Sequence, residues 1–129
     1  MADYTFSRTL DADLATAEAQ ARDALAAEGF GVLTEIDVQA TLKTKIDVDV
    51  PGYKILGACN PPLAHQAMQT EPKIGVMLPC NVILRDVGDG RTEVSAIDPV
   101  ASMAAVENDG LGEIADEVRQ RLRRVVEAL

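Results

Sequence analysis

The pattern of hydrophobic and polar residues predicts β-strands in five stretches of the chain, and in the first of them aromatic and polar residues alternate with a period of two. The stretches are residues 4–9, 30–36, 53–59, 75–87 and 91–97. The last two are joined by "GDG" at 88–90, and a glycine-containing connection of this length predicts a hairpin.

Between and after these stretches, apolar residues recur every three or four positions, which predicts helices. One helix is expected to start at Asp11 or Asp13, either of which can cap it, and to end at Gly29. Asp37 is expected to cap a short helix that continues through Lys45. The clearest stripe follows "NDG" (108–110) and consists of Leu111, Ile114, Ala115, Val118, Leu122, Val125, Val126 and Leu129.

Two further helix starts combine a capping side chain with proline at the first helical position. Asn60–Pro61 begins a helix that should end at Glu71, because Pro72 cannot continue it. Asp98–Pro99 repeats the arrangement. The order βαβαβαββα predicts one α+β domain over residues 1–129, with a mostly antiparallel or mixed sheet and helices on one face.

Alternation in two strands leads to a prediction about which side chains face the helices. In residues 53–59 one set has no charge and contains Cys59, and in residues 75–87 the uncharged set contains Cys80. If both uncharged sets are covered, the two cysteines share the helix-covered side. The residues left on an uncovered face include Leu56, Ala58, Met77 and Ile83. An apolar patch of that kind is unusual on a monomer, so we expect a homodimer.

Composition and charge exclude several classes of partner. The net charge of −9 and the pI of about 4.4 argue against nucleic-acid or anionic-membrane surfaces, which need clustered basic residues. The basic run Arg119 to Arg124 follows acids on the same predicted helix, which is typical of a solvated face. We expect no signal peptide and no membrane span, and two cysteines in such a chain indicate free thiols in the cytoplasm.

Six polar or sulfur-bearing side chains are the candidates for a site. They are Cys59, Asn60, His65, Cys80, Asn81 and Asp98. We expect the two cysteines to meet at one end of the sheet, in a small pocket with His65 near its rim, suited to a small polar ligand. Taken singly, each residue can also be a cap, a turn or a packed apolar group.

A metal or cofactor is not expected from these residues. Cys59, Cys80 and His65 are suitable in kind for zinc, but their spacing is not a known metal pattern and a fourth ligand is not evident. The aromatic content of 3% also argues against haem or another flat cofactor.

Three motifs carry a resemblance to a known family: "GFGVLTEIDVQATLK" (29–43), "YKILGACNP" (53–61) and "IGVMLPCNV" (74–82). In this order and spacing the chain resembles the domain of unknown function 302 family, from about residue 4 to residue 129. The resemblance implies a compact two-layer α/β domain, often dimeric, in bacterial and archaeal cytoplasm. It implies no established reaction.

Two hypotheses about function follow. The first is a dimeric binding or interaction module with a pocket near Cys59 and Cys80. The alternative is a thiol-dependent redox or sulfur-transfer enzyme in which Cys59 reacts and Cys80 resolves the intermediate. The two prolines after Asn60 remove N–H groups that would stabilise a Cys59 thiolate, which favours the first hypothesis.

Overall fold

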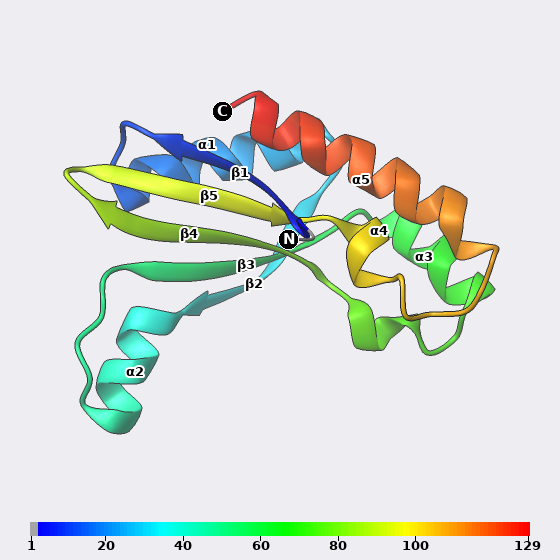
Figure 1. Ribbon diagram of the computed structural model, residues 1–129, viewed down its shortest axis with the longest axis horizontal. Coiled ribbons are helices and arrows are strands. Elements are labelled where there is room, and N and C mark those ends of the chain that lie inside the picture. Colours follow the sequence, from blue (N-terminus) through cyan, green and yellow to red (C-terminus); the bar gives the residue numbers. More distant parts are fainter. Residues whose placement is uncertain (1–2) are drawn as a thin grey trace.

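Five strands form one antiparallel sheet in the spatial order β1-β5-β4-β3-β2 (Figure 1). The computed structural model describes residues 3–129. The strands are β1 (Thr5–Leu10), β2 (Gly31–Asp37), β3 (Tyr53–Cys59), β4 (Cys80–Gly88) and β5 (Arg91–Ile97). All four neighbouring pairs are antiparallel, so β1 and β2 are the two edges. The predicted α+β class and the order of the main elements are confirmed.

Two long helices, α1 (Leu14–Ala27) and α5 (Leu111–Glu127), cover one face of the sheet. The short helix α2 (Val38–Ile46) projects from the β2 side, as Figure 1 shows. Helices α3 (Pro61–Thr70) and α4 (Pro99–Ser102) pack on α5, and the 3₁₀ helix η1 (Ile74–Met77) packs on α3. No helix in residues 3–129 has the length and apolar character needed to cross a bilayer.

Four helices begin at the side-chain caps that the sequence predicts. The carboxylates of Asp13, Asp37 and Asp98 and the amide oxygen of Asn60 each accept a hydrogen bond from a backbone N–H two or three residues ahead. The donor–acceptor distances run from 2.8 to 3.3 Å. Each cap satisfies one of the N–H groups that a helix start leaves without an intrahelical partner.

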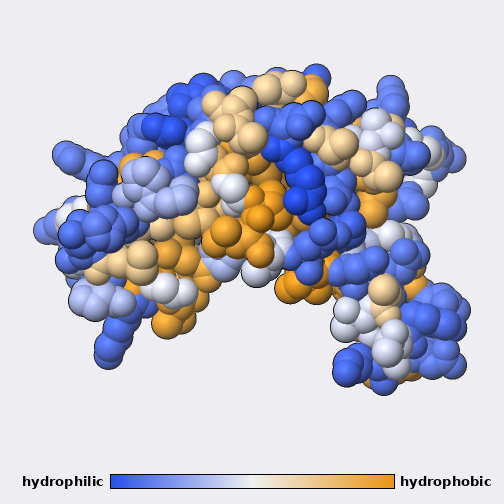
Figure 2. Space-filling model, turned by 180° about the vertical axis from the view of Figure 1, so that it is seen from behind, coloured by the Kyte–Doolittle hydropathy of each residue, from blue (hydrophilic) through white to orange (hydrophobic). Residues whose placement is uncertain are grey.

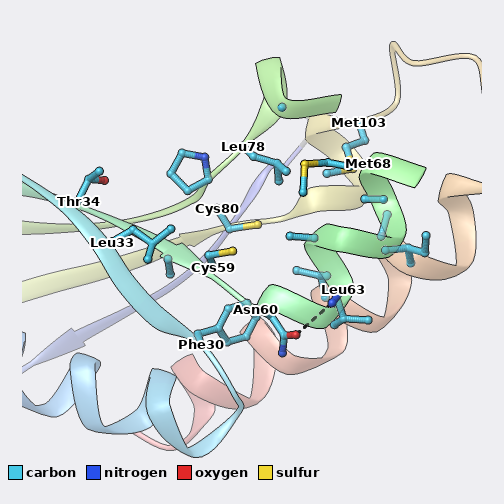
Figure 3. Close-up of a pocket in the computed structure, with 18 residues that line it drawn as sticks. Phe30, Leu33, Thr34, Cys59, Asn60, Leu63, Met68, Leu78, Cys80 and Met103 are labelled. Carbon is cyan, nitrogen blue, oxygen red and sulfur yellow. Dashed lines mark hydrogen bonds between the residues drawn. The ribbon is translucent and has the colours of Figure 1, made fainter. Parts of the chain in front are cut away.

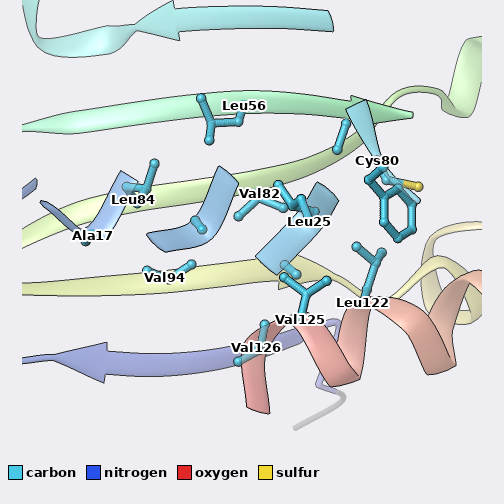
Figure 4. Packing of buried hydrophobic residues seen from close by; sticks show 14 of the residues in the cluster. Ala17, Leu25, Leu56, Cys80, Val82, Leu84, Val94, Leu122, Val125 and Val126 are labelled. Carbon is cyan, nitrogen blue, oxygen red and sulfur yellow. The ribbon is translucent and has the colours of Figure 1, made fainter. Parts of the chain in front are cut away.

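The core lies between the sheet and helices α1 and α5 (Figure 4). Alanines at positions 17 and 21 are fully buried, and their small side chains let α1 sit close to the strands. The apolar stripe predicted for α5 is confirmed, since its inward positions are buried. The fully buried large side chains of this core include Leu25, Leu56, Leu84, Leu122, Val82, Val94 and Val125.

The strand expected at residues 75–87 begins later than predicted. Residues Ile74–Met77 form η1, and β4 starts at Cys80. Pro79 has no N–H to donate to a strand ladder, so pairing begins only after it. Ile74 is also buried in a small cluster with Ala67 of α3 and Leu111 of α5, which holds this segment away from the sheet.

The predicted orientation of β3 is wrong. Leu56 and Ala58 are fully buried on the helix-covered face, where their register partners are Val82 and Cys80 of β4. Because side chains alternate along a strand, Cys59 leaves β3 on the opposite face from Cys80. The apolar patch expected to support a dimer therefore loses Leu56 and Ala58 to the core.

Lys54 faces the helices because carboxylates there meet its charge. Its ammonium nitrogen lies 2.7 Å from Glu18 Oε1 of α1 and contacts Glu35 of β2. Arg22 of α1 bridges the same two carboxylates at 2.9 Å each. The hydrogen bonds from Lys54 to Glu18 and Glu35 raise the pKa of the Lys54 ammonium. Burial raises the pKa of Glu18, but hydrogen bonds from Lys54 and Arg22 outweigh it, so the net pKa is lowered.

Candidate functional site

A pocket of about 330 Å³ lies where β3 ends and β4 begins, bordered by α3 and α5 (Figure 3). This volume is near the lower limit of ordinary small-molecule sites, which span about 300–1,000 Å³. The lining consists of Phe30, Leu33, Thr34, Ala58, Cys59, Asn60, Leu63, Ala64, Ala67, Met68, Gly75, Leu78, Pro79, Cys80, Met103, Ile114, Ala115 and Val118.

The chain folds around this pocket through the turn from β3 to α3. Cys59 is the last residue of β3, and Asn60 directly after it accepts a hydrogen bond from Leu63 N at 3.3 Å. This cap fixes the first turn of α3, which forms one wall. Cys80 starts β4 opposite Ala58, so its thiol is held at the same end of the sheet.

Three of the six candidate residues line the pocket. They are Cys59, Asn60 and Cys80. Although the two cysteines leave their strands on opposite faces, both reach the pocket because it lies where the sheet ends. Figure 3 shows their sulfur atoms directed into the same space.

The other three candidates lie outside the pocket lining. His65 is exposed on α3, and Asn81 is exposed on β4 opposite Gly57. Asp98 caps α4 and also accepts a hydrogen bond from Arg119 Nε at 3.2 Å. Of the six candidate residues, only Cys59, Asn60 and Cys80 therefore come together at one end of the sheet.

The two thiols differ in their surroundings. Cys59 is half-buried and Cys80 is buried, and the structure contains no bond between them. Burial raises the pKa of the Cys80 thiol to about 11, and the neighbouring Cys59 contributes to the rise. Cys80 is therefore a neutral thiol near pH 7, which behaves as a small apolar group.

Most of the pocket wall comes from residues that the sequence reasoning did not single out. Ile114, Ala115 and Val118 belong to the apolar stripe predicted for α5, and Met103 follows the short α4. Thr34 and Asn60 supply the hydroxyl and amide groups of an otherwise apolar or sulfur-bearing lining. Nothing in the period of an amphipathic helix distinguishes a position that lines a pocket from one that fills a core.

The side chains considered for zinc are not assembled. Across residues 3–129, no three side chains of the types His, Cys, Asp and Glu gather in a way that holds a metal ion. Cys59 and Cys80 line the pocket, but His65 does not.

The fold and the pocket together define a small α+β domain with an apolar site at one end of its sheet. The model of the family described as Domain of unknown function DUF302 matches residues 6–129, and the chain belongs to this family. A crystal structure of an uncharacterized conserved DUF302 protein from Bacillus stearothermophilus has the same fold, with a TM-score of 0.90, 24% identity and coverage of 98% of each chain. None of the curated proteins compared matches the chain.

Proposed function

We propose that the protein is a dimeric binding module whose pocket takes a small, largely apolar ligand. The observation that carries this proposal is the lining. No charged side chain appears in it among the described residues, and only the side chains of Thr34 and Asn60 contain oxygen or nitrogen. Moving apolar ligand surface from water into an apolar pocket contributes a favourable free energy of about 25 cal/mol per Å². The lining thus argues against the small polar ligand that the sequence suggests.

The same pocket is poorly equipped for a thiol-dependent enzyme. The pKa of Cys80, raised to about 11, leaves little thiolate to resolve a mixed disulfide near pH 7. Within residues 3–129, the pocket lining contains no histidine, aspartate, glutamate or lysine, so no side chain in it can act as a base toward a thiol. Binding is therefore the better supported function, and we place the protein in the reducing cytoplasm, where both thiols stay reduced.

We assign the dimer contact to the free edge of β2 and the projecting α2. Among the described residues β2 pairs with β3 alone, which leaves one side of its backbone without a strand partner. Four exposed apolar side chains lie here, and Figure 2 shows apolar residues gathered in the hollow beside the projecting α2. The exposed residues of this β2–α2 surface are Leu33, Ile36, Ile46 and Val48.

The helix α2 supplies a further reason for a second copy. None of its nine residues, all within the described part of the chain, is buried. Isolated helices this short are marginal in water, so α2 gains stability from a surface to pack on. A twofold pairing along β2 gives both chains a strand partner and both α2 helices a covering surface.

The ligand proposal is tested with primary alcohols from butanol to dodecanol, measured by calorimetry. Affinity should rise about fourfold per CH₂, corresponding to about 0.8 kcal/mol, and level off when the chain fills the pocket. Ala64→Leu adds a larger side chain to the lining and should weaken binding of the longest alcohols. Ala19→Leu makes the same change on an exposed position of α1 and should leave binding unchanged. Absence of a chain-length dependence refutes the proposal.

Sedimentation tests the dimer. The wild-type protein should sediment at twice 13.8 kDa at micromolar concentration. Ile36→Lys places a charge on the β2–α2 surface and should give monomer, because burying an unpaired ammonium opposes association. Val87→Lys is the matched control, since Val87 is 43% exposed and Ile36 is 48% exposed. A wild-type monomer, or an Ile36→Lys dimer of unchanged affinity, contradicts this interface.

A further inference from the structure

We propose that the pocket also binds one Cu(I) ion through sulfur, with Cys59, Cys80, Met68 and Met103 as the donor set. The inference rests on the pocket of the proposed function, but it does not depend on which apolar ligand that pocket takes.

The pocket gathers sulfur from distant parts of the sequence. The chain has two cysteines and four methionines, and both cysteines and two of the methionines line this one pocket. They come from four elements: the end of β3, the start of β4, helix α3 and the residue after α4. A core that needed only apolar volume would be filled equally well by leucine or valine at these positions.

The two thiols lie close to each other at the end of the sheet. Proximity of Cys59 contributes to the raised pKa of Cys80, and Figure 3 shows both sulfur atoms pointing into the pocket. In the same view the side chains of Met68 and Met103 extend toward the pocket from α3 and from the segment after α4. The thiols and thioethers therefore approach one cavity from different walls.

The chemistry of the donors selects the metal. Thiolate and thioether sulfur favour Cu(I), whereas Mg²⁺, Ca²⁺ and Mn²⁺ need carboxylate, carbonyl or water oxygens that this lining does not concentrate. Zinc ordinarily takes four ligands from Cys, His, Asp and Glu, and no three such side chains gather within residues 3–129. A monovalent cation also cancels the charge of one thiolate, which lowers the cost of forming that thiolate in an apolar site.

Binding releases the protons of the ligating thiols to solvent and changes no oxidation state. Cu(I) enters as Cu(I), bonds form from copper to sulfur, and each thiol that becomes a thiolate loses its S–H proton. Met68 and Met103 contribute lone pairs and release nothing. The site therefore needs no oxidant or reductant beyond the reducing conditions that keep copper monovalent.

The test is an anaerobic titration of the reduced protein with Cu(I) in competition with bicinchoninate. We expect one Cu(I) per chain and a first shell of sulfur alone by X-ray absorption. Cys59→Ala and Cys80→Ala should each weaken binding by more than about 100-fold, beyond the 10–100-fold that loss of an outer-shell partner costs. Melting curves of both variants establish that the chain still folds.

The methionines provide the sharper readout, because any pair of thiols binds some Cu(I). Met68→Leu with Met103→Leu should weaken binding by roughly 10-fold or more. Met77→Leu is the matched control, since Met77 lies in η1 outside the pocket lining, and it should change nothing. The urea-unfolded chain, which keeps both thiols, should bind far more weakly than the folded one.

Even if Cu(I) binds the wild-type protein, three outcomes overturn the inference. They are wild-type affinity in the double methionine variant, equal affinity in the unfolded chain, and nitrogen or oxygen in the first shell. If Cu(I) fails to bind while the alcohols bind with their chain-length dependence, the copper site is wrong and the apolar binding function stands. If Cu(I) binds with the expected variant pattern while no alcohol binds, the copper site stands and the proposed ligand class is wrong.

Discussion

Replacing Gly57 with alanine tests how tightly β3 packs beside the pocket. A Cβ on Gly57 would lie 2.1 Å from Thr34 Oγ1 and 2.7 Å from Pro79 Cγ. Both distances are below 3.0 Å, which real Cβ atoms essentially never show. Thr34 can turn about χ1 to move its hydroxyl, but the ring of Pro79 has little freedom, so the strands must shift.

The expected cost follows from overpacking, which destabilises by about 1–3 kcal/mol. With 129 residues and an unfolding entropy of about 2.1 cal/mol/K per residue, each kcal/mol lowers the Tm by about 4 °C. Gly57→Ala should therefore lower the Tm by about 4–11 °C. Thr34 and Pro79 both line the pocket, so binding of long alcohols should weaken as well.

Circular dichroism at 222 nm is the suitable assay, because the chain has no tryptophan for fluorescence. Gly31→Ala is the matched control: Gly31 also lies in a strand, and a Cβ there would meet nothing within 4 Å. The control should stay within about 0.5 kcal/mol of wild type. Thr34→Ala removes the nearest atom and should recover part of the cost in the double variant. A Gly57→Ala melting curve equal to that of Gly31→Ala refutes the reasoning.

Three further predictions concern stability. Asn60→Ala removes the cap of α3 and should cost about 1 kcal/mol by chemical denaturation, whereas an unchanged midpoint would show that the cap contributes nothing. Lys54→Met should cost about 1–3 kcal/mol at pH 7, between the values for exposed and buried ion pairs. Because the folded-state pKa of Glu18 is lowered, its pairing stabilises above the usual value of 4.5 and is lost as pH falls below it. The difference in unfolding free energy between wild type and Lys54→Met should thus shrink below pH 4.5. A difference that does not change with pH would contradict the stabilising role of the Lys54–Glu18 pair. Leu122→Ala should cost about 2–5 kcal/mol, since Leu122 is fully buried, and a smaller loss would mean that the core collapses around it.

Local chemistry in the sequence determined where most elements begin. Asp13, Asp37, Asn60 and Asp98 cap helices because their side chains reach an N–H two or three residues ahead, an interaction that needs no distant partner. The α5 stripe is equally local, since its period alone makes one face apolar. The three motifs likewise identified the family without any structural knowledge.

The tertiary structure decided which face of each strand is covered. Alternation divides a strand into two sets, but it does not say which set meets the helices. In β3 the charged set is the covered one, because Lys54 meets Glu18 from α1 and Glu35 from β2, and neither partner is close to it in sequence. An expectation based on charge alone therefore gave the wrong face.

The character of the pocket was also decided in three dimensions. The sequence pointed to Cys59 and Cys80 because they share a local setting, and the strand register does bring both to one end of the sheet. The apolar walls from α5 and the two methionines depend on how α3, α4 and α5 pack together, so no short segment contains that information. Local hydrogen bonds and period fix an element from its own residues, whereas a cavity is the space between elements, and only their packing determines what lines it.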